Sequence, residues 1–254
     1  MGETVAELRE AAVRRGGRTL LGPVSLRIGR GEFWGIAGPN GAGKTTLLKV
    51  LAGLLPPSEG HASGPPRGRI GVLLQHHAFL PDLPFTVEDV ALFGRTGIAG
   101  LGRPFRPEDR EAAREALDRL GLGGMKDRLY RDLSGGEQKK AQLARLLAQD
   151  ADLLLLDEPA AGLDLAAQEQ MTLLAGDLHR RTGRTFVMVT HEIDRLPAEC
   201  GRVLLLREGR VLAAGPPREV FLPETLSALY GCPMEVVSRG NRFHAFSLGG
   251  GPAP

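Results

Sequence analysis

One segment constrains the fold of this chain more than any other: Gly38-Pro39-Asn40-Gly41-Ala42-Gly43-Lys44-Thr45. It matches the pattern G-x-x-x-x-G-K-S/T, follows an apolar run that ends at Ala37, and precedes a helical pattern that begins at Thr46. Glycines in such a loop let successive backbone N–H groups point at one anion, and the helix N-terminus adds positive potential. We expect a phosphate-binding loop, with Lys44 at the β- and γ-phosphates of a nucleotide and Thr45 on Mg²⁺. The alternative is a glycine-rich turn that binds no ligand.

Short β-type runs alternate with helical patterns, which predicts an α/β domain with a largely parallel sheet. We expect strands at 32–37, 69–75, 152–157, 185–190 and 202–207, and helices after Gly43, Ser134, Asp164 and Glu192.

The strand signal disappears between residues 84 and 150, while apolar residues recur at helical spacing from 107 to 120. We therefore expect a helical subdomain at 85–150, inserted into an α/β core made of 1–84 and 151–220, with 94–107 as an exposed connection. Residues 221–254 are expected to form a C-terminal appendix. It should hold a short helix that stops at Gly231 and two β-like runs around Arg239-Gly240-Asn241.

The overall composition excludes few classes of protein. The formal charge of +2 over 254 residues gives no reason to expect nucleic acid as a partner. Two cysteines are too few for a disulfide framework, which favours a reducing compartment. The N-terminal residues lack the apolar segment of a secretory signal, and the longest apolar runs are too short to span a bilayer.

Two carboxylates, Asp157 and Glu158, end the apolar run 153–156. A continuous apolar strand is typical of a parallel sheet buried on both faces, and its C-terminal edge is where ligands bind. We expect Asp157 to hold Mg²⁺ through water and Glu158 to take a proton from an attacking water molecule. Without the phosphate-binding loop, both would be interpreted as ordinary loop residues.

Gln75 and His191 each end a predicted strand, so both are expected at the same sheet edge as the phosphate-binding loop. For each of these two side chains, the alternative to ligand contact is an ordinary surface or core role. Ser134-Gly135-Gly136-Glu137 fits the capping box S-x-x-E, which starts many ordinary helices.

In this order the motifs resemble one family, the ATPase subunits of ATP-binding cassette (ABC) transporters. The resemblance covers nearly the whole chain, and the combination of LSGGE with the LLLLDEP run shortly after it is highly specific. It implies a P-loop NTPase fold, with a RecA-like core, an N-terminal antiparallel β subdomain and an inserted helical subdomain. The motifs it assigns are the phosphate loop 38–45, the Q-loop glutamine Gln75, the signature 133–137, Walker B ending at Asp157, the catalytic Glu158, the D-loop 161–164 and the switch histidine His191.

The resemblance also implies how the site works. ATP with Mg²⁺ is bound by the phosphate loop and Thr46, with Thr45, Gln75 and Asp157 as metal ligands, and the catalytic residues are Glu158, His191 and Gln75. Two copies form a head-to-tail dimer, in which Ser134, Gly135, Gly136 and Glu137 of one copy face the γ-phosphate held by the other. Glycine allows the backbone to approach the ligand closely.

One position departs from the family pattern. Relatives carry an aromatic residue that stacks on adenine, and the corresponding place here falls near Arg15, with no Tyr, Phe or Trp nearby. A guanidinium plane can stack on a base, so we expect Arg15 in the nucleotide site and loose selectivity between ATP and GTP.

Residues 86–95 and 223–231 are similar to those of importers for iron-siderophores, haem and cobalamin. The resemblance then implies separate integral permease subunits, an extracytoplasmic substrate-binding protein, no nucleic acid, and a peripheral location at the cytoplasmic face of the cell membrane. The alternatives are an exporter or another cargo, or a soluble cassette ATPase that acts on ribosomes or nucleic acid. A metabolic P-loop kinase would leave LSGGE unexplained.

Overall fold

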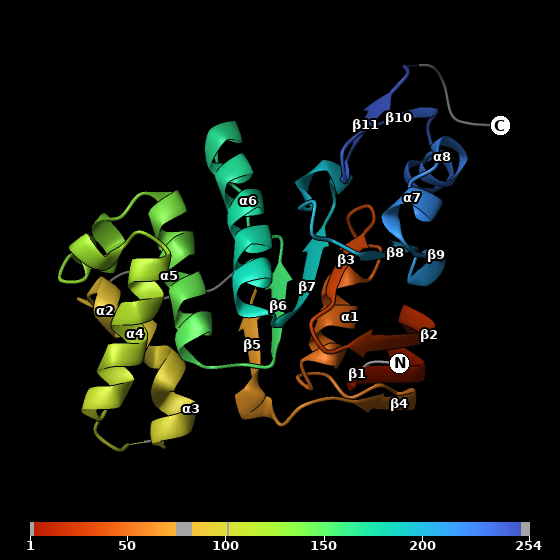
Figure 1. Ribbon diagram of the computed structural model, residues 1–254. Coiled ribbons are helices and arrows are strands. Elements are labelled where there is room, and N and C mark those ends of the chain that lie inside the picture. Colours follow the sequence, from red (N-terminus) through yellow and green to blue (C-terminus); the bar gives the residue numbers. More distant parts are fainter. Residues whose placement is uncertain (1–2, 75–82, 101, 250–254) are drawn as a thin grey trace.

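The fold, known from a computed structural model, is described for residues 3–74, 83–100 and 102–249 (Figure 1). Its centre is a six-stranded sheet in the order β5-β6-β7-β3-β8-β9. All neighbouring strands are parallel except the last pair, β8 and β9, which is antiparallel. The predicted α/β fold with a largely parallel sheet is confirmed. The strands are β3 (Phe33–Ala37), β5 (Ile70–Leu73), β6 (Leu153–Asp157), β7 (Thr185–Thr190), β8 (Arg202–Arg207) and β9 (Arg210–Gly215).

The central strands form because both faces of the sheet are covered. Every residue of β3, β6 and β7 is buried, as expected for unbroken apolar runs in a parallel sheet. Alternate residues of β6 enter two separate cores: Leu154 and Leu156 lie in one, Leu153 and Leu155 in the other.

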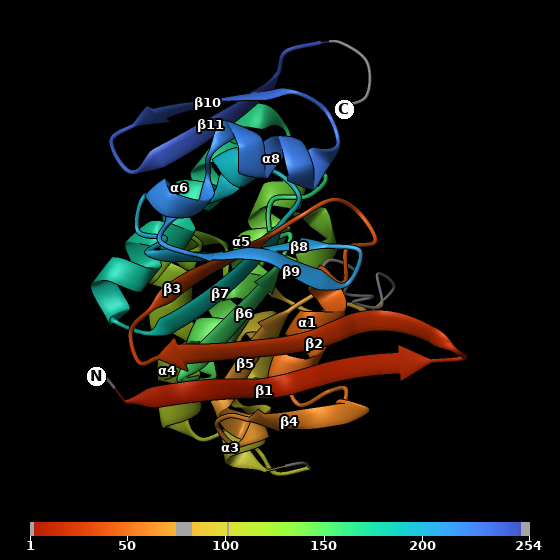
Figure 2. The same ribbon diagram turned by 90° about the vertical axis from the view of Figure 1, so that its right-hand side faces the viewer.

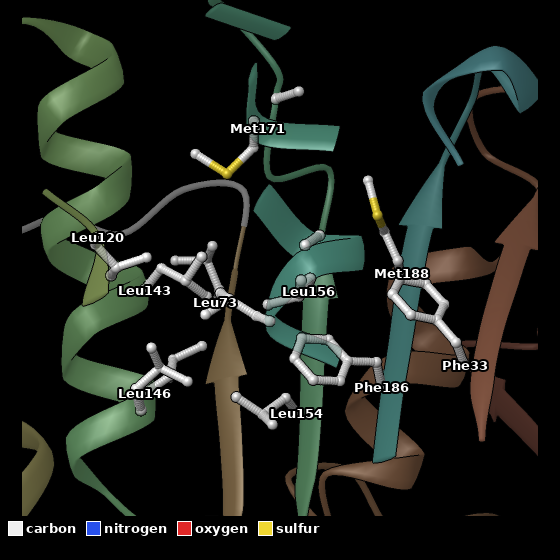
Figure 3. Packing of buried hydrophobic residues seen from close by; sticks show 14 of the residues in the cluster. Phe33, Leu73, Leu120, Leu143, Leu146, Leu154, Leu156, Met171, Phe186 and Met188 are labelled. Atoms are coloured by element: carbon white, nitrogen blue, oxygen red, sulfur yellow. The ribbon is translucent and has the colours of Figure 1, made fainter. Parts of the chain in front are cut away.

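Helices α5 (Gly135–Ala148) and α6 (Leu165–Thr182) pack on the first face of the sheet (Figure 3). There the rings of Phe33 and Phe186 stack with their centroids 5.5 Å apart. The opposite face is covered by α1 (Lys44–Leu51) and by a separate antiparallel sheet in the order β2-β1-β4. Its strands are β1 (Thr4–Arg15), β2 (Arg18–Gly29) and β4 (Glu59–Ser63).

The chain between β5 and β6 is helical in its described part, with α2 (Val87–Leu92), α3 (Thr96–Ala99), α4 (Pro107–Arg119) and α5. Our expectation of an exposed connection from 94 to 107 was wrong for its first residues, which form a 3₁₀ turn and α3. Gly94 packs against α5 so closely that a Cβ atom would lie 2.0 Å from the carbonyl oxygen of Arg145. Arg95, mostly buried, forms an ion pair with Asp109 at 2.9 Å.

The helix expected after Glu192 was also wrong, because only a 3₁₀ turn (Ile193–Arg195) forms there. Leu196 is extended, with φ −82° and ψ 132°. Pro197 follows it, and proline disfavours the helical conformation of the residue before it.

The C-terminal unit, defined here as residues 221–249, lies at one end of the molecule beside α6 (Figure 2). After the short α7 (Pro217–Val220), α8 (Pro223–Tyr230) ends at Gly231, whose φ of 75° is the left-handed conformation expected for a helix stop. Strands β10 (Met234–Arg239) and β11 (Arg242–Ser247) then form a hairpin.

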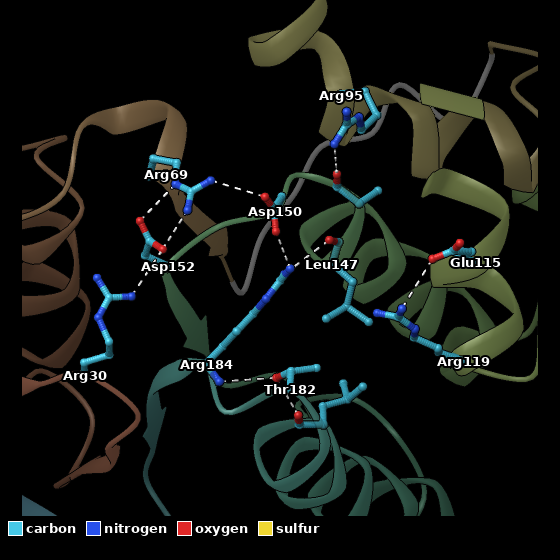
Figure 4. Close-up of polar contacts among 12 residues, drawn as sticks. Arg30, Arg69, Arg95, Glu115, Arg119, Leu147, Asp150, Asp152, Thr182 and Arg184 are labelled. Atoms are coloured by element: carbon cyan, nitrogen blue, oxygen red, sulfur yellow. Dashed lines mark hydrogen bonds and ion pairs between the residues drawn. The ribbon is translucent and has the colours of Figure 1, made fainter. Parts of the chain in front are cut away.

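The C-terminal end of α5 is bonded to the N-terminal ends of β5, β6 and β7 by a group of arginines and carboxylates (Figure 4). Arg184 donates to the carbonyl of Leu147 at 3.3 Å and to Asp150 at 2.6 Å, and Arg69 pairs with Asp150 and Asp152. Arg145, also on α5, donates to the carbonyl of Val72 in β5 at 3.1 Å.

Helices long and apolar enough to cross a membrane are absent from the described residues.

Candidate functional site

The phosphate-binding loop connects β3 to α1 and is shaped by glycines whose φ angles are positive. Gly43 has a φ of 96°, and a Cβ atom there would lie 2.8 Å from the carbonyl oxygen of Leu20. Gly41 has a φ of 79° and faces open space. These backbone conformations favour glycine, so the sequence pattern and the loop geometry agree.

Lys44 places its ammonium group at the centre of this loop. Its Nζ donates to the carbonyl oxygens of Gly38 at 2.7 Å and Pro39 at 3.0 Å, and lies 3.9 Å from Oε1 of Glu158. The side chain is only 6% exposed, and burial lowers the pKa of Lys44, opposed by the neighbouring carboxylates. The arrangement concentrates positive charge where the phosphates of a nucleotide would bind.

Thr45 and Asp157 meet at the end of β6. Thr45 Oγ1 donates to Oδ2 of Asp157 at 2.9 Å, while Oδ1 of Asp157 is buried and has no hydrogen-bond partner among the described residues. Burial raises the pKa of Asp157, and the nearby Glu158 adds to this effect. A buried carboxylate oxygen without a donor fits a bound Mg²⁺, with Thr45 as its neighbouring ligand. When bound, Mg²⁺ would neutralise phosphate charge.

Glu158 follows directly and points differently, because its backbone turns into the left-handed region with a φ of 47°. The turn is held by a hydrogen bond from its N–H to the carbonyl of Val189 at 3.0 Å. Its Oε1 lies 3.2 Å from Nδ1 of His191, which follows β7. Lys44, Asp157, Glu158 and His191 therefore come together as the sequence predicted.

A cavity of about 590 Å³ opens over the loop. Besides loop residues and Glu158, its lining includes four residues that the sequence analysis did not identify: Thr19, Leu20, Glu208 and Gly209. Glu208 and Gly209 form the β8–β9 turn with φ of 52° and 74°, and Gly209 N–H donates to Ala42 at 3.1 Å. The Glu-Gly pair directly after a predicted strand was the available signal for this turn.

Arg15 does not line this cavity; it is exposed at the turn between β1 and β2. Thr19 and Leu20, which follow that turn in the sequence, do line the cavity, and Leu20 is 39% exposed. The stacking role of Arg15 stays a prediction. Gln75 lies outside the described residues.

A second cavity of about 280 Å³ shares Asn40 and Glu158 with the first. It extends along the D-loop residues Ala161 and Gly162 to His191. The site therefore continues beyond the phosphate-binding loop toward a surface that the D-loop flanks.

The signature segment begins α5 with the predicted capping box. Ser134 Oγ accepts from the N–H of Glu137 at 3.3 Å, and Glu137 accepts from the N–H of Ser134 at 2.8 Å. Ser134 and Gly135 are exposed, and the described residues that line the two cavities include none of Ser134, Gly135, Gly136 and Glu137. Within one chain, the structure does not bring the signature to the phosphate-binding loop.

Comparison with known proteins agrees with this site. A family model described as ABC transporter matches residues 21–161, more than half of the chain. The chain belongs to the ABC transporter family and is an ATP-binding subunit that hydrolyses ATP with Mg²⁺.

Three relatives are particularly similar. The hemin import ATP-binding protein HmuV of Streptomyces coelicolor is 41% identical over 92% of this chain and 86% of its own length. The zinc transport system ATP-binding protein TroB of Treponema pallidum is 41% identical over 84% of this chain and 82% of its own. A solved structure, described as an inward-facing conformation of a putative metal-chelate type ABC transporter, matches with a TM-score of 0.87 and 27% identity, covering 97% of this chain and 98% of that one.

Proposed function

We propose that this ATPase drives the import of a metal chelate, such as an iron chelate, haem or cobalamin, through separate permease subunits at the cytoplasmic face of the cell membrane. The similarity to a hemin importer subunit and to a metal-chelate type transporter supports this cargo class. The tail 223–231, which forms α8 and its glycine stop, supports it as well. The similarity to a zinc transport subunit leaves a free metal ion as the competing cargo.

The single observation that carries the catalytic part is the meeting of Lys44, Asp157, Glu158 and His191 at one sheet edge. In our proposal Lys44 binds the β- and γ-phosphates, and Asp157 with Thr45 holds Mg²⁺. Glu158 takes a proton from the attacking water, and His191 stabilises charge at the γ-phosphate.

We propose further that two copies complete the site between them. The signature is exposed at the N-terminus of a 14-residue helix, whose backbone N–H groups and positive potential suit a phosphate. Ser134, Gly135 and Gly136 of one copy would therefore close the site of the other in a twofold dimer. The helical subdomain, residues 85–150, and the Q-loop region around Gln75 would contact the permease.

Purification from native membranes tests the transport role. We expect an integral permease to co-purify with the chain and an extracytoplasmic binding protein for a metal chelate to be encoded with it. Recovery of ribosomes or nucleic acid in place of a permease would refute the proposal in favour of a soluble cassette ATPase.

Light scattering tests the dimer. A Glu158→Gln variant with Mg·ATP should have twice the mass that it has with Mg·ADP, because the γ-phosphate bridges the two copies only before hydrolysis. A monomer under both conditions would refute the composite site.

A further inference from the structure

We infer that the C-terminal unit positions His191 beside Glu158, with Tyr230 as the positioning residue. This inference rests on the proposed role of His191 in hydrolysis. Tyr230 is the last residue of α8, far from the phosphate-binding loop in sequence. Its hydroxyl donates to the backbone carbonyl of His191 at 3.0 Å. The contact is made to the same residue whose ring nitrogen lies 3.2 Å from Glu158.

Other contacts hold the loop that carries His191 only beyond that residue: Ile193 is buried in the core, and Thr172 of α6 donates to the carbonyl of Arg195 at 3.3 Å. It lies between β7 and a 3₁₀ turn, and the His191 side chain is 42% exposed. Within the loop, Thr190 Oγ1 donates to the carbonyl of Glu192 at 3.0 Å and accepts from its N–H at 3.1 Å. These bonds shape the backbone around His191, but they do not connect the loop to the body of the protein.

A second side chain of the C-terminal unit contacts the same loop three residues after His191. Arg242, at the start of β11, donates to the carbonyl of Asp194 at 3.0 Å. Its guanidinium also pairs with Glu169 of α6, with one of these bonds at 3.0 Å. The loop is therefore held on either side by side chains of the C-terminal unit, one of them anchored to α6.

Tyr230 is suited to hold a carbonyl permanently. Its ring is partly buried in the core cluster that includes Phe221 and Phe243, so the hydroxyl has a fixed direction. Burial raises the pKa of Tyr230 to about 12, which keeps the hydroxyl protonated, and thus a donor, throughout the physiological range. The ion pair of Arg242 with Glu169 orients the guanidinium in the same way.

Loss of this hydrogen bond should change turnover and leave nucleotide binding intact. His191 does not line the larger cavity over the phosphate-binding loop, whereas it does line the smaller one beside Glu158. A Tyr230→Phe variant keeps the ring and removes only the donor. We expect kcat for ATP to fall by about threefold to tenfold, the range that one net hydrogen bond accounts for, with KM within twofold of the wild-type value.

The matched control is Ser227→Ala, on the same helix. Ser227 Oγ donates to Pro223 at 2.6 Å and accepts from the N–H of Met234 at 2.9 Å, so it supports the C-terminal unit without contacting the His191 loop. We expect Ser227→Ala to keep the wild-type kcat, even if it lowers Tm as much as Tyr230→Phe does. Arg242→Met should lower kcat like Tyr230→Phe, again with an unchanged KM.

Steady-state ATPase measurements on the full chain, with His191→Ala in parallel, decide between the outcomes. If His191→Ala loses most activity while Tyr230→Phe keeps the wild-type kcat, the positioning inference is wrong and the proposed role of His191 stands. Equal losses in Tyr230→Phe and Ser227→Ala would also overturn it, because they would indicate general destabilisation. Full activity of His191→Ala would refute the proposed role of His191, and the inference with it.

Discussion

Replacing Asp157 by asparagine should make the nucleotide-free protein more stable while impairing its chemistry. Asp157 is 2% exposed, and only one of its carboxylate oxygens has a hydrogen-bond donor among the described residues, namely Thr45. The folded protein therefore holds a buried charge that is not fully compensated. An asparagine keeps the shape and still accepts from Thr45, but it carries no charge.

The size of the gain follows from two opposing costs. A buried neutral polar group without a partner costs about 1–3 kcal/mol, and a charged one costs more. Asp157→Asn replaces the cost of a buried charge by the smaller cost of a buried neutral group. That smaller cost remains because the amide group at the position of Oδ1 has no partner. The difference between the two costs gives an expected net gain of about 1–2 kcal/mol at pH 8. That gain corresponds to a Tm higher by roughly 2–8 °C for a chain of this length.

The gain should depend on pH in a defined direction. Since burial raises the pKa of Asp157 in the folded state, ionisation of this carboxyl destabilises the wild-type protein. The penalty is absent below the ordinary value of 3.8, grows as the pH rises through the raised pKa, and is complete above it. The advantage of Asp157→Asn should therefore be largest at pH 8 and shrink as the pH falls toward 4.

Thermal unfolding between pH 4.5 and 8, with and without Mg·ADP, measures these effects. Mg·ADP should raise the Tm of the wild type more than that of Asp157→Asn, because the variant offers the metal a neutral ligand. Asp164→Asn is the matched control: Asp164 caps α6 by accepting from Ala167 N–H at 2.8 Å, and asparagine caps equally well. A lower Tm for Asp157→Asn at pH 8, or an advantage that grows as the pH falls, would refute this reasoning.

Three further predictions concern the same site. Glu158→Gln should lower kcat about 100-fold or more with nucleotide affinity retained, because the amide cannot take a proton; turnover and equilibrium binding of ATP check this. Gly43→Ala should lower the free energy of unfolding by about 1–3 kcal/mol more than Gly41→Ala, because a Cβ atom at Gly43 would lie 2.8 Å from the carbonyl of Leu20 and one at Gly41 would meet no atom. Equal losses of both variants in urea unfolding would contradict this. GTP should compete with ATP within about tenfold, a factor worth roughly 1.4 kcal/mol, because no Tyr, Phe or Trp lies near Arg15 in the sequence; a strong preference for ATP in competition binding would argue against this.

The central strands and the polar residues at their C-terminal ends were predictable because the same physical cause determines both. Strands buried on both faces must be continuously apolar, so 153–156 and 185–190 were visible as runs, and the polar residues that follow them had to emerge at one edge. Asp157, Glu158 and His191 were placed correctly by this argument alone.

The remaining site residues depend on packing between segments that lie far apart in the sequence. Thr19 and Leu20 belong to a different sheet, and Glu208 reaches the cavity because the β8–β9 turn docks on the phosphate-binding loop. No local pattern records such docking. The helix expected after Glu192 does not form for a local reason, because Pro197 disfavours the helical conformation of Leu196.

Helix α5 joins two features that were described separately. Its last turn is bonded to the sheet through Arg145 and Leu147, and Asp150 just after the helix adds a further bond, while the exposed Ser134 caps its N-terminus. The 14 residues of this helix span about 21 Å at ~1.5 Å per residue, and the helix is held at the end that contacts the N-terminal ends of the strands. A tilt of about 10° there would swing Ser134 by roughly 4 Å over this length, more than the span of a hydrogen bond. A small change in the position of the helix beside β5 would therefore become a larger displacement of Ser134 at the opposite end of the helix.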